Sequence, residues 1–154
     1  MIIRRAELSE FDAIWPILRD VFRAGETYAV DPAITKATCR AYWMAQPVAT
    51  YVAEAAGAIV GTYYIRTNQP GGGAHICNCG YVVAEAARGR GLARQMCIHS
   101  QQEAAALGYQ AMQFNFVLAN NVGAVTLWQR LGFETVGTIP DAFVHPRDLS
   151  LIHI

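Results

Sequence analysis

A short run of glycine and arginine is the part of this sequence whose chemistry is clearest. Residues 88–93, with the sequence RGRGLA, join an apolar strand-like run at 81–83 to a helical pattern that begins near Leu92. Glycine lets a backbone approach a phosphate closely, and the first turn of a helix carries unpaired N–H groups at the positive end of its dipole. Two arginines add positive charge at the same place. The run therefore indicates an anion site, with an exposed turn that binds nothing as the alternative.

The spacing of these residues narrows the kind of anion site. The run fits neither the phosphate loop G-x-x-x-x-G-K-[ST] nor the dinucleotide pattern G-x-G-x-x-G. It fits R/Q-x-x-G-x-G/A, and in this it resembles the pyrophosphate loop of the GNAT family, the acetyl-CoA-dependent N-acetyltransferases. The resemblance implies acetyl-CoA as co-substrate.

Composition limits the class of protein. The chain has 154 residues, 53% of them hydrophobic, and we expect one domain over 1–154 with a full core. Twelve basic and twelve acidic residues cancel, so charge gives no argument for nucleic acid or an anionic membrane as partner. The sequence shows no apolar run of about 18 residues and no secretory signal pattern, so we expect a cytoplasmic protein.

The cysteines favour packing over chemistry. They lie at positions 39, 77, 79 and 97, without a C-x-x-C pair or a zinc pattern, which predicts reduced thiols and no metal site. Cys77 and Cys79 alternate along a strand and share a face, as core residues do.

Hydrophobic periodicity predicts a mixed order of strands and helices. Helices are expected at Phe11–Phe22, Thr35–Met44, Leu92–Leu107 and Asn121–Leu131, and strands at Ile2–Leu8, Ala49–Ala55, Ala58–Thr67, His75–Val83, Ala111–Leu118, Glu134–Thr138 and Leu149–Ile154. Residues 68–74, with three successive glycines, form a flexible loop in this prediction. The order predicts an α/β protein with a central mixed sheet of about six to seven strands flanked by helices. The strands on either side of helix 92–107 should pair in parallel.

The resemblance to the GNAT family covers nearly the whole chain. The element order, the pattern Asn121-x-x-Ala124 and the run 131–133 (LGF) also fall where the family places them, which implies the GNAT acyl-CoA N-acyltransferase fold. The resemblance implies that backbone groups at Tyr81 and Val83 bind pantetheine like an added strand, and that Asn121 holds the pantetheine arm from the other side. N–H groups from Gly89 to Arg94 would hold the pyrophosphate. The cofactor-binding residues implied are Tyr81, Val82, Val83, Arg88, Gly89, Arg90, Gly91, Leu92, Ala93, Arg94 and Asn121.

Two further features of the predicted strand His75–Val83 are expected. A bulge near 78–82 would free its backbone groups, and an N–H near Val82 or Val83 would stabilise the oxyanion.

Trp128 departs from the family pattern. Much of the family has a tyrosine at this position, the last of N-x-x-A-x-x-x-Y, which protonates the leaving CoA thiolate. Indole has no acidic proton near neutral pH. Either another group protonates the thiolate or it leaves as the anion, which a thiol pKa of about 8.5 allows. We interpret Trp128 as a core residue.

Two asparagines within predicted strands are candidate catalytic and substrate-binding residues. Asn78 and Asn115 would need partners inside a sheet, and both could face a cleft where neighbouring parallel strands splay apart. There they would offer N–H donors to an acceptor's carboxylate or carbonyl. The alternative is that each satisfies a nearby backbone group. The patterns H-x-C-N-x-G-[YF] and F-N-x-V-x-x-N resemble a GNAT branch that acetylates azetidine-2-carboxylate and other proline analogues, in which both asparagines contact substrate.

A group must also take the proton of the attacking amine. An amine of pKa about 10.4 is almost wholly protonated at pH 7 and attacks only when neutral. Candidate bases are Glu26, Tyr28, Asp31, His75 and Glu85. The first three lie in the loop that the family uses to line the acceptor pocket, so Glu26 and Tyr28 are predicted substrate-binding residues.

The sequence thus predicts an acetyl-CoA-dependent N-acetyltransferase that acts on a small-molecule amine or amino acid by direct attack in a ternary complex. A protein N-terminal or lysine acetyltransferase is one alternative. A non-catalytic acyl-CoA-binding sensor is another, because the tyrosine is missing. Exposed sheet edges leave a homodimer open.

Overall fold

The computed structural model describes residues 1–147 and 151–152. The helices are α1 (Phe11–Ala24), α2 (Lys36–Arg40), α3 (Leu92–Ala106) and α4 (Val122–Arg130), with a π-helical turn at Ala41–Ala45 and 3₁₀ turns at Leu8–Glu10, Gly71–Gly73 and Glu85–Ala87. The strands are β1 (Ile2–Arg5), β2 (Ala49–Ala55), β3 (Ala58–Thr67), β4 (Ile76–Val83), β5 (Ala111–Met112), β6 (Phe143–Val144) and β7 (Leu151–Ile152).

The chain divides into two compact units. The sheet unit consists of Met1–Arg19 and Thr35–Phe114, and the second unit of Asp20–Ile34 and Asn115–Ile154. Each unit is built from two separate segments of chain. The expectation of a single domain stays a prediction.

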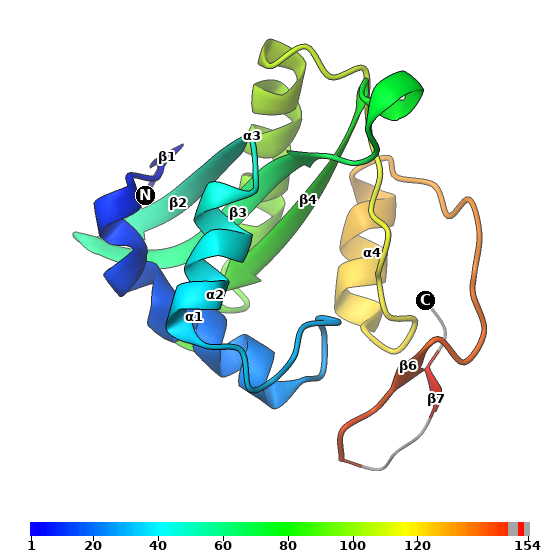
Figure 1. Cartoon of the computed structure of the whole chain (residues 1–154), viewed down its shortest axis with the longest axis horizontal. Helices are drawn as coiled ribbons and strands as arrows, with labels where there is room; N and C mark the ends of the chain where they lie inside the picture. Colours follow the sequence, from blue (N-terminus) through cyan, green and yellow to red (C-terminus); the bar gives the residue numbers. More distant parts are fainter. Residues whose placement is uncertain (148–150, 153–154) are drawn as a thin grey trace. The chain divides into compact units, whose positions relative to one another are not determined.

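A five-stranded sheet is the centre of the sheet unit. Its strand order is β1-β2-β3-β4-β5, antiparallel from β1 to β4 and parallel between β4 and β5 (Figure 1). The chain passes from β4 to β5 through α3, so the predicted parallel pairing across this helix is confirmed. The predicted α/β class is confirmed as well.

One face of the sheet packs against α3. Tyr51 of β2 and Tyr63 of β3 stack with ring centroids 4.8 Å apart. Their hydroxyl groups reach α3, where that of Tyr51 donates to Glu103 at 2.7 Å and that of Tyr63 lies 2.6 Å from Nδ1 of His99. Because both phenols are hydrogen-bonded, these large side chains can be buried without leaving a polar group unpaired.

The opposite face packs against the π-helical turn that follows α2. Trp43 of this turn is fully buried, and its indole N–H donates to Oγ1 of Thr62 on β3 at 3.0 Å. The hydroxyl of Thr50 on β2 donates to the backbone carbonyl of Trp43 at 2.6 Å. Trp43 therefore ties the turn to two strands, and Figure 1 shows α2 and α3 on opposite sides of the sheet.

The second unit contains α4 and the pair of strands β6 and β7, which is antiparallel. The side chain of Asn121 caps α4 by accepting the N–H of Ala124 at 3.3 Å. Phe116 and Phe143 meet edge to face with centroids 6.0 Å apart.

The strand predictions differ from the structure at the C-terminal side. The sheet has five strands instead of six or seven, because Glu134–Thr138 forms no strand and β6 and β7 form a separate pair. Residues 134–138 are exposed, so their β-branched residues find no partner strand or apolar face. The predicted strand Ala111–Leu118 is paired only at Ala111–Met112. Of the predicted strand Leu149–Ile154, Leu151–Ile152 is a strand, and the rest lies outside the described residues.

Other boundaries differ less. The first strand ends at Arg5 because the chain turns into the 3₁₀ segment Leu8–Glu10. The glycine-rich loop contains a 3₁₀ turn at Gly71–Gly73.

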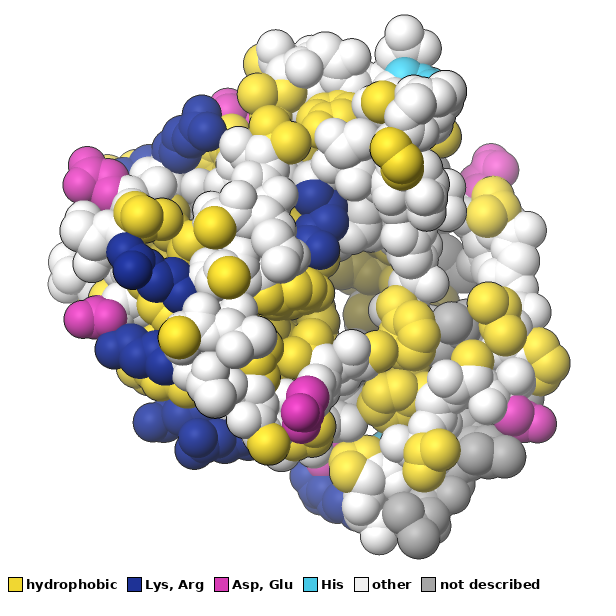
Figure 2. Space-filling model, in the orientation of Figure 1, with side chains coloured by type: hydrophobic (Ala, Val, Ile, Leu, Met, Phe, Trp, Pro, Cys, Tyr) yellow, Lys and Arg dark blue, Asp and Glu magenta, His cyan; other side chains and the backbone are white. Residues whose placement is uncertain are grey.

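On the face drawn in Figure 2, Lys and Arg side chains lie with Asp and Glu side chains among them. This mixed surface agrees with the formal net charge of zero.

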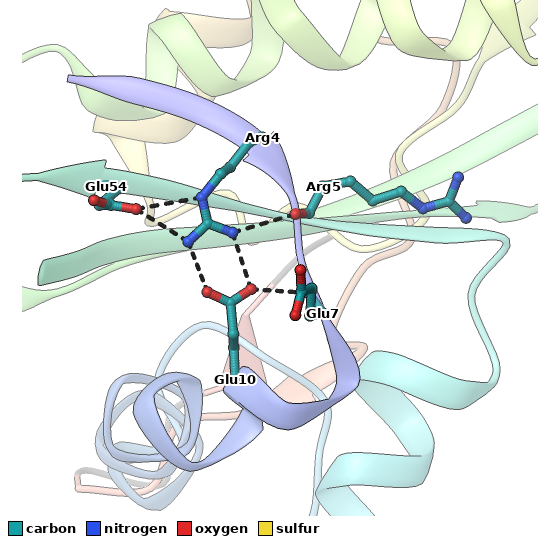
Figure 3. A network of polar contacts seen from close by, with 5 residues as sticks. All are labelled: Arg4, Arg5, Glu7, Glu10 and Glu54. Atoms are coloured by element: carbon teal, nitrogen blue, oxygen red, sulfur yellow. Dashed lines mark hydrogen bonds and ion pairs between the residues drawn. The ribbon is translucent and has the colours of Figure 1, made fainter. Parts of the chain in front are cut away.

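A charged network joins β1, the first 3₁₀ turn and β2. Arg4 donates from Nη2 to Glu10 at 2.6 Å and to Glu54 at 3.0 Å, and Figure 3 shows its guanidinium group between the two carboxylates. The backbone N–H of Glu7 donates to Glu10 at 2.8 Å. The hydrogen bond from Arg4 is the first cause that lowers the pKa of the Glu10 carboxyl. The charged groups of this network are hydrogen-bonded to one another, so we interpret the network as structural.

Candidate active site

β4 has one edge that β5 covers only in part. β5 pairs with β4 at Ile76 and Cys77, and the N–H of Gln113 then donates to the carbonyl of Cys77 at 2.8 Å. On the other side, β3 pairs with β4 without a register shift as far as Val83. Beyond Cys77, β4 is therefore held by β3, and in the described chain β5 no longer pairs with it.

Hydrogen bonds at the two ends of β4 define the direction of its backbone groups. The N–H of Ala84 donates to Val60 at 2.9 Å, and the N–H of Asn68 donates to Ile76 at 2.9 Å. In an antiparallel ladder, the residues that exchange hydrogen bonds with the partner alternate along each strand. The even-numbered residues of β4 therefore direct their N–H and C=O groups toward β3.

The odd-numbered residues of β4 direct their backbone groups the other way. The carbonyl of Cys77 does so, since it accepts from Gln113. The backbone groups of the next odd-numbered residues point the same way, away from β3. These residues are Cys79, Tyr81 and Val83. An extended arm with amide groups could pair there as an added strand. Two of these residues, Tyr81 and Val83, are the ones that the family resemblance implied for pantetheine.

The predicted bulge near 78–82 is wrong. β3 and β4 pair without interruption, and the register shift of the sheet lies between Ala53 and Glu54 in β2. The edge of β4 is open because β5 is short. Val82 lies opposite Thr62 and directs its backbone toward β3, so Val83 is the better placed of the two predicted oxyanion donors.

A left-handed glycine turn leads into α3. Gly89 and Gly91 have φ of 74° and 73°, and Gly91 is the N-cap of α3. No side chain caps α3 at this residue, and a Cβ at either glycine would meet nothing within 4 Å. The first turn of α3 therefore has no side-chain cap at Gly91, and the space beside both glycines is open, which suits an anion.

The arginines of this turn supply charge on exposed side chains. Arg88, Arg90 and Arg94 are exposed. The backbone N–H of Arg88 is already used, since it donates to Glu85 at 3.1 Å and closes the 3₁₀ turn. Predicted backbone binding of phosphate can therefore involve Gly89 to Arg94, whereas Arg88 contributes its side chain.

Asn78 is half-buried on β4, and part of its amide serves the fold. Nδ2 donates to the carbonyl of Gln113 at 2.9 Å, and Oδ1 accepts from the hydroxyl of Tyr64 at 3.4 Å. The alternative that this amide satisfies a neighbouring backbone group is therefore correct in part. The second N–H of Nδ2 has no partner among the described residues. It remains available to a ligand.

Asn115 does not lie in a strand. It follows β5, is exposed and belongs to the second unit. The predicted strand ends at Met112 because the chain leaves β4 after Gln113. The pairing of Asn115 with Asn78 at one substrate stays a prediction.

The loop residues predicted to line an acceptor pocket lie in the second unit. Glu26 forms an ion pair with Arg147. Tyr28 packs edge to face on Phe22 with centroids 5.3 Å apart, and Oδ1 of Asp31 accepts the N–H of Ala33 at 2.8 Å. Each of these three candidate bases has a local structural contact, so no general base is singled out. The other two, His75 and Glu85, are exposed in the sheet unit.

Asn121 and Trp128 lie on α4. The side chain of Asn121 caps the helix, so its oxygen is already in use, and its contact with pantetheine stays a prediction. Trp128 is half-buried and meets Phe133 edge to face at 6.3 Å. This contact agrees with a packing role.

Arg66 is a residue that the sequence patterns did not single out. It lies at the end of β3 directly opposite Asn78 and carries the only charge in the strand Ala58–Thr67. A lone arginine in an apolar strand was the available signal. Nη2 donates to the carbonyl of Tyr42 at 2.9 Å, while the buried Nε has no hydrogen-bond partner in the described chain.

The described residues contain neither a membrane-spanning helix nor a group of metal ligands. None of their helices is long and apolar enough to cross a membrane. No three His, Cys, Asp or Glu side chains among them are grouped so that they could hold a metal ion.

With the open edge of β4 and the glycine turn before α3 established, comparison with known proteins identifies the class. Residues 11–133 match the acetyltransferase (GNAT) family. The chain belongs to this family, so the predicted family, the acyltransferase class and acetyl-CoA as the family's co-substrate are confirmed.

Individual relatives agree with this assignment. A GCN5-related N-acetyltransferase from Kribbella flavida has a similar structure, with 41% sequence identity, a TM-score of 0.91, and coverage of 99% of this chain and 94% of the other. The N-acetyltransferase aca1 of Schizosaccharomyces pombe is 37% identical over 84 residues, which are 54% of this chain and 40% of that protein. The match thus spans less than half of this curated relative.

A third protein shares the fold at lower identity. A phosphinothricin acetyltransferase from Sinorhizobium meliloti, solved in complex with acetyl-CoA, is 17% identical with a TM-score of 0.86, covering 99% of this chain and 83% of the other.

Proposed function

We propose that the protein transfers the acetyl group of acetyl-CoA to the amine of a small molecule or amino acid, by direct attack in a ternary complex. The observation that supports this most is that the open edge of β4 and the glycine turn before α3 follow each other directly along the chain. The outward-facing backbone at Tyr81 and Val83 leads within a few residues into the left-handed turn at Gly89 and Gly91 and the uncapped start of α3.

These features suit the two parts of CoA. The pantetheine arm has amide groups that need partners, which the backbone of Tyr81 and Val83 would supply without using side chains. The pyrophosphate would accept N–H groups from Gly89 to Arg94, at the positive end of the α3 dipole. Because the phosphates bind after Val83 in the chain, the arm runs back along β4 and its acyl end points toward Asn78.

Bound acetyl-CoA supplies an acyl thioester. In the transfer, the N–C bond forms, the C–S bond breaks, and the amine loses a proton to water or a nearby base. Trp128 cannot protonate the sulfur, so either another group protonates it or CoA leaves as a thiolate, which its pKa of about 8.5 permits.

Direct attack is preferred to an acyl-cysteine intermediate. Cys77 and Cys79 are buried, at 0% and 7% exposure. The hydrogen bond with Cys77 and then burial raise the pKa of the Cys79 thiol. The same hydrogen bond lowers the pKa of Cys77, but this side chain is fully buried and out of reach of a thioester. A thiol held protonated is a poor nucleophile.

The test measures CoA release from acetyl-CoA with a thiol reagent while the acceptor is varied. The panel contains simple amines, free amino acids including azetidine-2-carboxylate, and peptides with a free N-terminus or a lysine. Turnover with a free amine or amino acid is expected. Turnover with peptides alone would favour a protein acetyltransferase. CoA binding without turnover on any acceptor would favour a sensor and contradict the proposal.

A further inference from the structure

We propose that Arg66 binds the carboxylate of the acceptor, so that the acceptor is a free amino acid and not a simple amine. This inference rests on the proposed function and adds the chemistry of its second substrate. It depends on residues of the sheet unit alone.

The guanidinium group of Arg66 is held in a fixed position. Its Cζ lies 4.2 Å from the ring centroid of Tyr64 and 4.7 Å from that of Tyr42. Nη2 donates to the carbonyl of Tyr42 at 2.9 Å. Two cation–π contacts and a hydrogen bond orient the planar group before any ligand arrives.

The charge of Arg66 is not neutralised within the described chain. None of the acidic side chains there lies within 4.0 Å of its guanidinium nitrogens, and the buried Nε has no hydrogen-bond partner. A buried donor without a partner is costly, and more so when it is charged. A carboxylate that accepts from the guanidinium group could supply the missing charge.

Polar groups that suit a carboxylate lie beside Arg66. Asn78 is its direct partner in the β3–β4 register, so the two side chains are on the same face of the sheet, with Cβ atoms about 5 Å apart. The hydroxyl of Tyr64 is also on this face, where it donates to Oδ1 of Asn78 at 3.4 Å and so helps to orient the amide. Burial raises the pKa of Tyr64, which keeps this hydroxyl protonated. Asn78 retains one N–H for a ligand.

The position along the strand suits an amino acid. Each pair of residues advances about 7 Å along a strand. An arm bound at Val83 and Tyr81 therefore brings its acyl end to the level of Cys79, one residue from Asn78. Arg66 lies at the level of Asn78 on the next strand. In an α-amino acid the amine and the carboxylate are separated by one carbon, so both could reach their partners together.

The experiment compares acceptors that differ only in charge. L-Alanine, L-leucine and L-proline are assayed beside their carboxamides, with the wild type, R66Q and R66K, at saturating acetyl-CoA. We expect R66Q to lower kcat/KM for the acids about tenfold to a hundredfold and for the amides less than about threefold. R66K keeps the charge without the planar fork and should fall between. CoA affinity should not change.

R5Q is the matched control. Arg5 also donates to a backbone carbonyl, that of Val48 at 3.2 Å, but it is exposed on β1. The R5Q substitution removes the same charge and should leave the ratio of kcat/KM for acids to kcat/KM for amides unchanged. Thermal unfolding checks that each variant folds. If R66Q does not fold, the acids and amides are compared with R66K instead.

A binding measurement separates this inference from the proposed function. Calorimetry titrates the same acids and amides into the CoA-saturated protein. Tighter binding of the acids that is lost in R66Q supports the inference even if no acceptor turns over. Equal acid-to-amide ratios in the wild type and R66Q, or no binding of either compound, would overturn it while leaving acetyl transfer to other amines possible.

Discussion

Replacing Gly91 by aspartate should weaken CoA binding while leaving the fold intact. Gly91 is the N-cap of α3 with φ of 73°, and a Cβ there would meet nothing within 4 Å. Asparagine and aspartate tolerate this left-handed conformation better than other side chains, at about 1 kcal/mol. Gly91→Asn and Gly91→Asp therefore strain the backbone alike and differ in one charge.

The charge sets the size of the effect. Two unit charges about 4 Å apart interact by about 1 kcal/mol in water and about 4 kcal/mol at an effective dielectric constant of 20. The Kd for CoA should thus be about fivefold to a thousandfold higher in Gly91→Asp than in Gly91→Asn. Raising the salt concentration should narrow this gap, because screening weakens the repulsion.

Calorimetry with CoA and with pantetheine, which lacks the phosphates, provides the assay. The wild type should bind CoA much more tightly than pantetheine, and Gly91→Asp should lose most of that preference. Melting temperatures of the unliganded variants should differ little from each other. Equal CoA affinity of the Asp and Asn variants would refute the placement of the pyrophosphate at this turn.

Three further predictions concern packing, the acceptor and pH. Trp128→Phe should keep a large fraction of turnover and lower the free energy of unfolding by about 1–2 kcal/mol through lost packing; a folded variant with a thousandfold lower kcat would show a catalytic role. Asn78→Ala and Asn115→Ala should each lower kcat/KM for the acceptor about tenfold to a hundredfold without changing acetyl-CoA affinity, and unchanged acceptor kinetics would make that residue structural. Because Arg4 lowers the pKa of Glu10, the stabilisation it gives is present above the ordinary pKa of about 4.3 and is lost as pH falls through the lowered value. Glu10→Gln should therefore destabilise the protein at pH 7, and urea unfolding should show the difference from wild type shrink below about pH 4, whereas a constant difference would argue against the ion pair.

Periodicity located the elements that bury a continuous face. The strands Ala49–Ala55 and Ala58–Thr67 have the predicted bounds, and α3 begins at the predicted residue, Leu92. Local chemistry also defined the glycine turn, because a left-handed backbone at Gly89 and Gly91 is a property of glycine itself.

The wrong strand predictions share one cause. Alternation of apolar and polar residues predicts an extended chain, but it does not predict which strand that chain will pair with. Residues 111–118 alternate as a strand should, yet only Ala111–Met112 is paired with β4. Residues 134–138 have strand-forming side chains and no partner. Strand propensity reflects packing on neighbours, so it cannot be judged without them.

The sequence by itself determined the family, the order of elements as far as α4 and the turn before α3, because these depend on residue type and on spacing along the chain. Only the tertiary structure decided which backbone groups of β4 face outward, since that depends on the register with β3 and on where β5 stops. It also decided the surroundings of Arg66, whose neighbours Tyr42 and Asn78 are brought to it from the turn after α2 and from β4. Contacts between residues distant in sequence depend on how the elements pack, which spacing along one chain does not encode directly.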